Sequence, residues 1–481
     1  MATRSHCFVL LLFLLVVPLL AQGQESGGWN FSLLPDVPGE IGLGGPLVGN
    51  HDGALIVAGG ANFPTPLTEG GSKVWHDDVY VLLPGAERWF TGQKLPQPLA
   101  YASCTSTPRG VVVAGGSDAD QVYSTVFLMR WDAAAKKVFF DPLPDLPAAS
   151  AFGSAEAIGD IVYLFQGKHQ KSDLELKGGF WQLDLSDVES GWQSLPSHSG
   201  PVRYKMVTAV QRGPGGEPCL FLFSGARTTE TEQGDPRFLA YTDGYRYSPA
   251  TGEWVLVASL PVLGDSRQIV GKERFADQRW PISAACAEAV GTRAILTFSG
   301  STDRHILDDD GKVRPADERP AFLPRVLAYD TISDQWSEVA SMPVGVVTTE
   351  AVKWHQQIVI PSGETQPGIR TAQVQALSLA TSVGGAHFGT LDYTVLALYL
   401  ALMVAVGIYF ARRSSTTDDF FLAGRKIPWW AAGLSVFGTQ LSAITFMAIP
   451  ATSYGSDWRR FVGSVMLLPV MLLVIYCFLP L

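Results

Sequence analysis

A carboxylate and a guanidinium stand on either side of a turn in residues 357–379, QIVIPSGETQPGIRTAQVQALSL. Glu364 follows an apolar run that ends in Ser-Gly, and Arg370 follows a Pro-Gly pair. A carboxylate can act as a general base, and a guanidinium can hold an anion through two parallel hydrogen bonds. The pair predicts acid–base chemistry on an acidic substrate. The alternatives are that Glu364 is a solvated turn residue, which spacing alone favours, and that Arg370 is a charge at a strand edge.

The apolar run before Glu364 is the last of six similar runs. A second run with an aromatic residue and a third with tryptophan follow most of them, and a Leu-Pro or Met-Pro step closes most units. The glycines that end the six runs stand 51 to 75 residues apart. This spacing predicts four-stranded propeller blades, with the repeated Trp and Tyr side chains packed between them. The runs are 54–60, 111–116, 161–167, 219–225, 294–300 and 357–363.

The two ends of the repeat region complete each other. Residues 29–35 read as the last strand of a blade that has no earlier strands, and residues 374–379 read as a third strand that has no fourth. Pairing the first segment with the last closes the ring and leaves no open sheet edge. The sequence therefore predicts an all-β, six-bladed, kelch-type β-propeller over residues 29–379.

Three motifs in this region resemble those of one enzyme family. GGANFP (59–64), KVWHDDVY (73–80) and GETQPGIRT (363–371) are similar to those of the cyclically permuted sialic acid mutarotases, or N-acetylneuraminate epimerases. The resemblance covers about residues 29–380. It implies an isomerase without a cofactor, in which Glu364 is the catalytic residue. Exchange between anomers moves a proton between the anomeric hydroxyl and the ring oxygen, which is general acid–base work.

Two further residues are candidates for binding the sugar. Asn62 follows a Gly pair at a strand end, and Arg203 precedes the first strand of the fourth blade. A turn-stabilising Asn is the alternative for Asn62. We expect no metal site in the propeller, because Ile306 occupies the first ligand position of the calcium-loop-like segment 308–311.

Composition narrows the class of partner. The net charge of −10 and the lack of long Lys/Arg clusters argue against nucleic acid. Outside the two apolar ends, only Cys104, Cys219 and Cys286 remain, and no CxxC occurs. This argues against a disulfide framework and against a zinc site.

The first 23 residues have the pattern of a secretory signal peptide. Arg4 precedes the apolar run 8–20, which is too short to span a bilayer, and Ala21-Gln22-Gly23 offers small residues for cleavage. We expect this segment to be removed and the propeller to be exported.

A different composition begins after a linker, residues 380–390. Residues 391–481 contain three uncharged stretches long enough to span a bilayer as helices: 393–410, 429–454 and 461–481. The first connecting loop carries Arg412, Arg413, Arg425 and Lys426, so the positive-inside rule predicts that it is cytoplasmic. The propeller would then lie on the extracytoplasmic side, periplasmic or extracellular. Arg459 and Arg460 run mildly against this orientation.

The stretch 418–458 resembles the start of a sodium:solute symporter. Carried over by position, the resemblance implies sodium contacts at Gly438 and Leu441 and substrate contacts at Gln440, Ser442 and Thr445. The family fold needs two inverted five-helix repeats, whereas this chain holds three spans of a truncated bundle. Sodium binding requires the complete symporter, and helix packing through small residues is the alternative for these positions.

These features predict a membrane-tethered propeller that acts as a sialic acid mutarotase, fused to the opening helices of a symporter. The expected partners are sialic acid or a related acidic sugar and the lipid bilayer. One alternative is a non-catalytic kelch propeller that binds a protein or glycan. Another is a sodium-coupled sugar transporter with an accessory domain, which would need the remaining helices.

Overall fold

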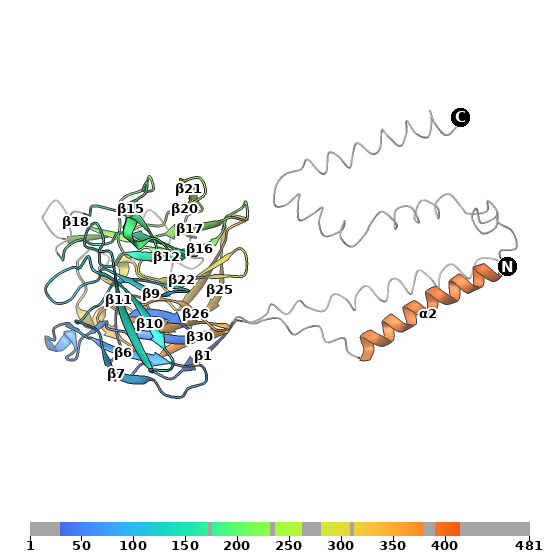
Figure 1. Cartoon of the computed structure of the whole chain (residues 1–481), viewed down its shortest axis with the longest axis horizontal. Helices are drawn as coiled ribbons and strands as arrows, with labels where there is room; N and C mark the ends of the chain where they lie inside the picture. Colours follow the sequence, from blue (N-terminus) through green and yellow to red (C-terminus); the bar gives the residue numbers. More distant parts are fainter. Residues whose placement is uncertain are drawn as a thin grey trace, which may run out of the picture. The chain divides into compact units, whose positions relative to one another are not determined.

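A computed structural model describes residues 29–171, 176–230, 236–261, 280–307, 312–378 and 390–413 (Figure 1). The chain divides into two compact units, residues 1–381 and 382–481, which we describe separately. The predicted signal peptide lies outside the described residues. So do the second and third predicted spans, with Gly438, Gln440, Leu441, Ser442 and Thr445.

The first unit consists of six four-stranded antiparallel sheets, which form the blades of a propeller. Strands form because each blade carries runs of buried aliphatic residues, such as Ala54–Ala58 and Gly110–Ala114. The first strands of neighbouring blades lie against each other, so these strands line the central channel. The first three blades are β2 (Leu47–His51), β3 (Ala54–Ala58), β6 (Asp78–Leu82), β7 (Phe90–Lys94); β8 (Ser103–Thr107), β9 (Gly110–Ala114), β10 (Val126–Asp132), β11 (Lys137–Leu143); and β12 (Ser154–Ile158), β13 (Ile161–Phe165), β14 (Phe180–Asp184), β15 (Gln193–Ser194).

The other three blades follow the same pattern, and short hairpins and 3-10 turns connect the strands. The blades are β16 (Val207–Arg212), β17 (Pro218–Phe223), β20 (Gly244–Ser248), β21 (Glu253–Val257); β22 (Cys286–Val290), β23 (Ala294–Phe298), β24 (Arg325–Asp330), β25 (Gln335–Ser341); and β26 (Val352–Trp354), β27 (Gln357–Pro361), β30 (Val374–Ser378), β1 (Asn30–Leu34). The hairpins are β4 (Ala61–Asn62) with β5 (Val74–Trp75), β18 (Ala226–Glu230) with β19 (Pro236–Ala240), and β28 (Glu364–Gln366) with β29 (Ile369–Arg370). The 3-10 turns are η1 (Leu67–Glu69), η2 (Val188–Ser190), η3 (Asp303–His305) and η4 (Ala316–Glu318).

The sixth blade takes its outer strand from the start of the chain. β1 pairs with β30 in antiparallel register from Asn30–Ser378 to Leu34–Val374, and both strands are labelled in Figure 1. Trp29 and Phe31 pack against a core cluster that contains residues of the fifth and sixth blades. The predicted ring closure and the six-bladed propeller are therefore confirmed.

A ring of six backbone hydrogen bonds joins the blades at the channel. In five blades the donor N–H belongs to the residue two positions before the first strand, and in the sixth blade it belongs to the residue four positions before β26. Each acceptor carbonyl belongs to the equivalent residue of a neighbouring blade. The distances are 2.7–2.9 Å, and all six residues have left-handed φ angles of 53–63°. We call this set the central ring: Gly45, Tyr101, Phe152, Lys205, Ala284 and Thr348.

Tryptophan side chains join the outer parts of the blades. The indole N–H groups of Trp89, Trp192, Trp254 and Trp336 donate to backbone carbonyls of a neighbouring blade at 2.7–3.1 Å. A buried indole needs such an acceptor. The prediction that the repeated Trp residues pack between blades is confirmed.

The described part of the second unit is one helix, α2 (Thr390–Arg413), which includes the first predicted span. Across the residues that the structure describes, no helix meets the length and apolarity needed to cross a membrane.

Removing the strand that closes the ring should weaken the propeller. A chain that begins at Pro35 lacks residues 29–34, leaves the β30 edge unpaired, and loses two partly buried aromatic side chains that pack against the core. We expect a loss of about 4 kcal/mol, similar to truncating one buried aromatic residue. For a domain of this size that lowers the unfolding temperature by roughly 5 °C. Calorimetry measures the unfolding temperature of this chain and of a chain that begins at Trp29. Equal unfolding temperatures would contradict the prediction.

Candidate functional site

Glu364 and Arg370 face each other across the β28–β29 hairpin. They are a cross-strand pair, and the Arg370 Nη2 lies 2.6 Å from Glu364 Oε1. The second carboxylate oxygen, Oε2, accepts a hydrogen bond of 3.1 Å from the hydroxyl of Thr348, a member of the central ring. The Pro-Gly turn brings the pair together, because opposite positions on an antiparallel hairpin place side chains in contact.

The Arg370 guanidinium is buried without its full set of partners. Its side chain is 2% exposed, and Nε and Nη1 have no hydrogen-bond partner among the described residues. Its carbon Cζ lies 4.6 Å from the centre of the Phe63 ring. A buried N–H without an acceptor is costly, so Arg370 is incompletely paired among the described residues.

The repeat places Glu364 at the mouth of the channel. In every blade, a glycine follows the second strand. The next residue forms a β-bridge with the residue that directly precedes the central-ring residue. Glu364 holds this position in the sixth blade, and Lys168 holds it in the third. The other four blades have small residues there: Ala61, Ser117, Ala226 and Ser301. Glu364 is therefore the one acidic side chain among these six equivalent positions. We call the opening of the channel beside these positions the channel mouth.

Lysines and aromatic rings surround the channel mouth. Tyr101 and Phe152, adjacent in the central ring, stack with their centroids 4.2 Å apart. Lys73 Nζ lies 5.0 Å from the Tyr101 ring centre, and Lys205 Nζ lies 5.4 Å from that of Phe152. Lys168 Nζ lies 4.5 Å from the ring centre of Tyr204. With Arg370, the mouth holds four cationic groups around Glu364, an arrangement that attracts anions.

Lys205 is the lysine that the central ring itself contributes. Burial lowers the pKa of its ammonium to about 8. The Glu364 carboxylate opposes this pKa shift, whereas the positive charges of Lys168, Lys73 and Arg370 add to it. This lysine was not identified from the sequence, because the charged groups around it come from other blades.

Asn62 has both ends of its amide engaged. Its Nδ2 donates to the carbonyl of Gly42 at 3.0 Å, and its Oδ1 lies 2.8 Å from Nε2 of His76. Burial lowers the pKa of His76, which favours the neutral ring that can donate to this oxygen. These contacts match the turn-stabilising alternative for Asn62.

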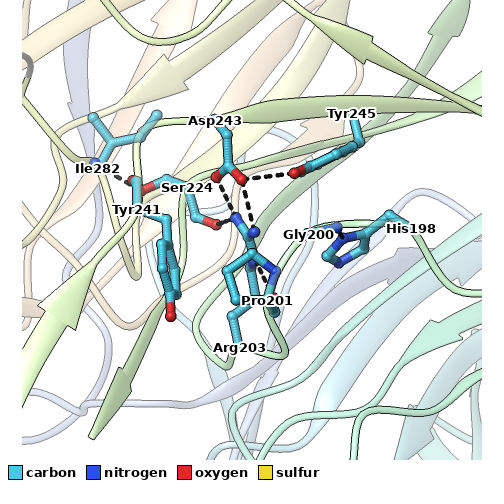
Figure 2. A network of polar contacts seen from close by, with 9 residues as sticks. All are labelled: His198, Gly200, Pro201, Arg203, Ser224, Tyr241, Asp243, Tyr245 and Ile282. Carbon is cyan, nitrogen blue, oxygen red and sulfur yellow. Dashed lines mark hydrogen bonds and ion pairs between the residues drawn. The ribbon is translucent and has the colours of Figure 1, made fainter. Parts of the chain in front are cut away.

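Arg203 lies in a buried ion pair with Asp243 (Figure 2). Its Nη1 and Nη2 contact the two carboxylate oxygens of Asp243 at 2.5 and 2.9 Å. Nη1 also donates to the carbonyl of Ser224 at 2.9 Å, and Nε donates to that of Pro201 at 3.0 Å. With 0% of its side chain exposed, Arg203 stabilises the fourth blade, and its guanidinium offers no exposed surface to a ligand.

A large cavity lies deeper in the channel than the channel mouth. It has a volume of about 630 Å³, all six blades line it, and Glu156, Glu288 and Glu350 contribute carboxyl groups. Burial raises the pKa of Glu156 to about 8 and that of Glu350 to about 7, and it also raises the pKa of Glu288. We call this cavity the inner channel. The sequence does contain a pattern that could have indicated the inner channel. Each of the three glutamates is followed by alanine and then by an apolar residue. Among the described residues, no cluster of His, Cys, Asp or Glu is arranged to hold a metal ion.

Comparison with known proteins divides the chain into two parts. Over 48% of the chain it is 26% identical to N-acetylneuraminate epimerases of Yersinia enterocolitica and Haemophilus influenzae, covering 56% and 57% of their lengths. The solved "Structure of YjhT" shares the fold, with a TM-score of 0.50 and 12% identity over 71% of this chain and 96% of that one.

The C-terminal part has different relatives. The model of the sodium:solute symporter family matches residues 420–481. A 93-residue stretch, 19% of the chain, is 50% identical to the sodium/sialic acid symporter NanT of Aliivibrio fischeri and to SiaT of Proteus mirabilis. The chain spans little more than half the length of the epimerases and less than a fifth of that of the symporters.

Arg203→Met should destabilise the propeller, because it leaves the Asp243 carboxylate without its cation. We expect a loss of about 3 kcal/mol, the scale for breaking a buried pair from one side. Arg109→Met is the control, since Arg109 pairs with Asp160 at an exposed position, where such pairs contribute about 0.5 kcal/mol. Chemical denaturation measures both, and equal losses would contradict the role of Arg203.

The difference in stability between wild type and Arg203→Met should also depend on pH. Burial alone would raise the pKa of Asp243, but hydrogen bonds from Arg203 and Tyr245 hold the pKa below its usual 3.8. A carboxyl with a lowered pKa contributes stability above its unfolded pKa and loses it as the pH falls through the folded pKa. Without Arg203, burial raises the pKa of Asp243 in the folded variant. The stability gap between wild type and Arg203→Met should therefore be largest at neutral pH, begin to shrink as the pH falls through the raised pKa of the variant, and shrink further until the pH is below the lowered folded pKa of the wild type.

Proposed function

We propose that the propeller interconverts the anomers of sialic acid or a related acidic sugar. The observation that carries the proposal is the Glu364–Arg370 pair, in which a carboxylate and a guanidinium with two unpartnered N–H donors meet beside the channel. Similarity to the N-acetylneuraminate epimerases over half of the chain supports the same substrate class. The similarity of the C-terminal part to sialic acid symporters supports it independently.

The pair divides the work of binding and catalysis. An oxygen of the sugar carboxylate binds Nη1 of Arg370, one of the two donors that burial has left without an acceptor. Glu364 takes the proton of the anomeric hydroxyl, which is the step that opens the sugar ring. The contacts of Glu364 with Arg370 and Thr348 fix its orientation before the sugar arrives.

The charge of the channel mouth selects for an acidic sugar. Lys73, Lys168 and Lys205 add positive charge around the one acidic residue of the mouth. A concave site lined by one sign of charge raises the local concentration of oppositely charged ligands. Aromatic faces beside these lysines suit the apolar side of a sugar ring.

The remainder of the chain supplies location. The signal peptide at residues 1–23 directs export of the propeller. Residues 380–390 form a linker, and residues 391–481 form three membrane helices that anchor the chain, so that the propeller lies on the extracytoplasmic side. In the complete symporter fold, Gly438 and Leu441 would contact sodium, and Gln440, Ser442 and Thr445 would contact the sugar. An enzyme tethered beside a transporter raises the local concentration of the sugar form that it produces.

A non-catalytic binding propeller is the second candidate. Glu364 already contacts three protein groups, namely Arg370, the Thr348 hydroxyl and, at 3.4 Å, the backbone N–H of Gly368. A purely structural carboxylate would show the same contacts. Under this alternative the Glu364→Gln protein binds the sugar normally, and neither it nor the wild type changes the rate of anomer exchange.

Glu364→Gln should slow anomer exchange by roughly 10²- to 10⁴-fold, the usual contribution of a general base. Gln has nearly the shape of Glu and can still accept the hydrogen bond from Thr348, but it cannot take up the proton. Proton NMR of freshly released α-sialic acid with the full chain in detergent follows the conversion to the β form. Glu87→Gln, an exposed carboxylate far along the chain, is the control and should keep the wild-type rate. No acceleration by the wild type would exclude the enzyme function.

A further inference from the structure

Opening and closing a sugar ring requires an acid as well as a base. When the base removes the proton of the anomeric hydroxyl, the bond between the anomeric carbon and the ring oxygen breaks, and that oxygen needs a proton. Glu364 can serve as the base in the function proposed above, but it cannot supply both protons at once. The channel mouth must therefore hold a proton donor, or water must supply the proton.

We propose that Lys205 is the general acid that protonates the ring oxygen, opposite the base Glu364. This inference rests on the proposed function and adds a second catalytic residue to it. Lys205 and Thr348 both belong to the central ring, separated by Ala284, and they line the same small cavity of about 60 Å³. Because Thr348 holds the Glu364 carboxylate, the ring places the lysine and the carboxylate at one opening.

The ammonium of Lys205 is available to a ligand. No described carboxylate or hydrogen-bond acceptor pairs with it, and its charge rests on the face of Phe152 at 5.4 Å. By contrast, Lys353, which lines the inner channel, is held by Glu288 at 3.2 Å. A lysine that is partly buried, unpaired and beside an aromatic face suits a group that must give up a proton.

The charges around Lys205 set its proton affinity. Lys73, Lys168 and Arg370 face it from the first, third and sixth blades, and Glu364 faces it from β28. Glu350, which lines the same small cavity, lies just inside the ring. Burial lowers the pKa of Lys205 to about 8, so the ammonium is protonated at neutral pH yet far more acidic than an exposed lysine. A general acid works best when its pKa lies near the working pH.

The step balances in both directions. Glu364 accepts the proton of the anomeric hydroxyl, and the electrons of that O–H bond form the carbonyl. The bond from the anomeric carbon to the ring oxygen breaks, and its electron pair takes the proton of the Lys205 ammonium. Rotation about the bond to the carbonyl carbon then presents the opposite face of the carbonyl. The ring hydroxyl attacks this face and gives its proton to the Lys205 amine. Glu364 then protonates the carbonyl oxygen, and both residues regain their starting states.

Two variants of Lys205 separate proton donation from simple charge attraction. Lys205→Arg keeps the positive charge but cannot release a proton near neutral pH, and Lys205→Met keeps the length without the charge. Both replace one side chain with another at the same left-handed backbone position, so the backbone bonds of the ring persist. Lys137→Met, at an exposed lysine on β11, is the control, and thermal unfolding checks that each variant folds.

The full chain in detergent is assayed by proton NMR between pH 6 and pH 9. We expect the wild-type rate to fall above about pH 8, as the Lys205 ammonium loses its proton. Both Lys205 variants should lose roughly 10²-fold in kcat and should lack this alkaline decline. Lys205→Arg should keep a KM close to that of wild type, whereas Lys205→Met should raise it.

The outcomes discriminate between this inference and the function on which it rests. A wild type that does not accelerate anomer exchange overturns both. An active wild type whose Lys205→Arg variant keeps its kcat and its alkaline decline overturns the general acid alone, and assigns the lysine to binding the acidic sugar. A Lys205→Met variant with wild-type kcat also overturns the general acid.

Discussion

A closed ring of six backbone hydrogen bonds holds this propeller together at its axis. Each of the six residues adopts a left-handed φ angle, and five of them are not glycine, so each of these five costs of order 1 kcal/mol in backbone strain. The strain persists because each ring residue both donates to one neighbouring blade and accepts from the other. All six blades must therefore be in place before any one ring residue is fully satisfied.

The ring also separates two parts of the channel with different ionisable groups. On the outer side, lysines and Arg370 surround Glu364. On the inner side, Glu156, Glu288 and Glu350 line the larger cavity, and Glu350 also lines the small cavity at the ring. The cationic groups are therefore concentrated on the outer side of the ring, which is the side that attracts anions.

Local patterns predicted the blades, the ring closure and the Glu364–Arg370 contact, because each depends on residues close in sequence or on a strand count. The Pro-Gly turn alone brings Glu364 opposite Arg370. The roles of Arg203 and Asn62 were different. The partner of Arg203 is Asp243, 40 residues away, and a sequence cannot show that four of the five guanidinium N–H groups already have acceptors. Lys205 was missed for the same reason, since the groups that change its proton affinity come from three other parts of the chain.

The pairing of β1 with β30 has a consequence for how the protein is made. Asn30 meets Ser378, a separation of 348 residues, and contacts so distant along the chain form slowly because a long loop must close first. β1 is synthesised before the other strands of the propeller but stays unpaired until β30 has been made. Throughout that interval its backbone groups lack a partner strand, so a chaperone that shields them would help this chain more than a chain whose strands pair in order.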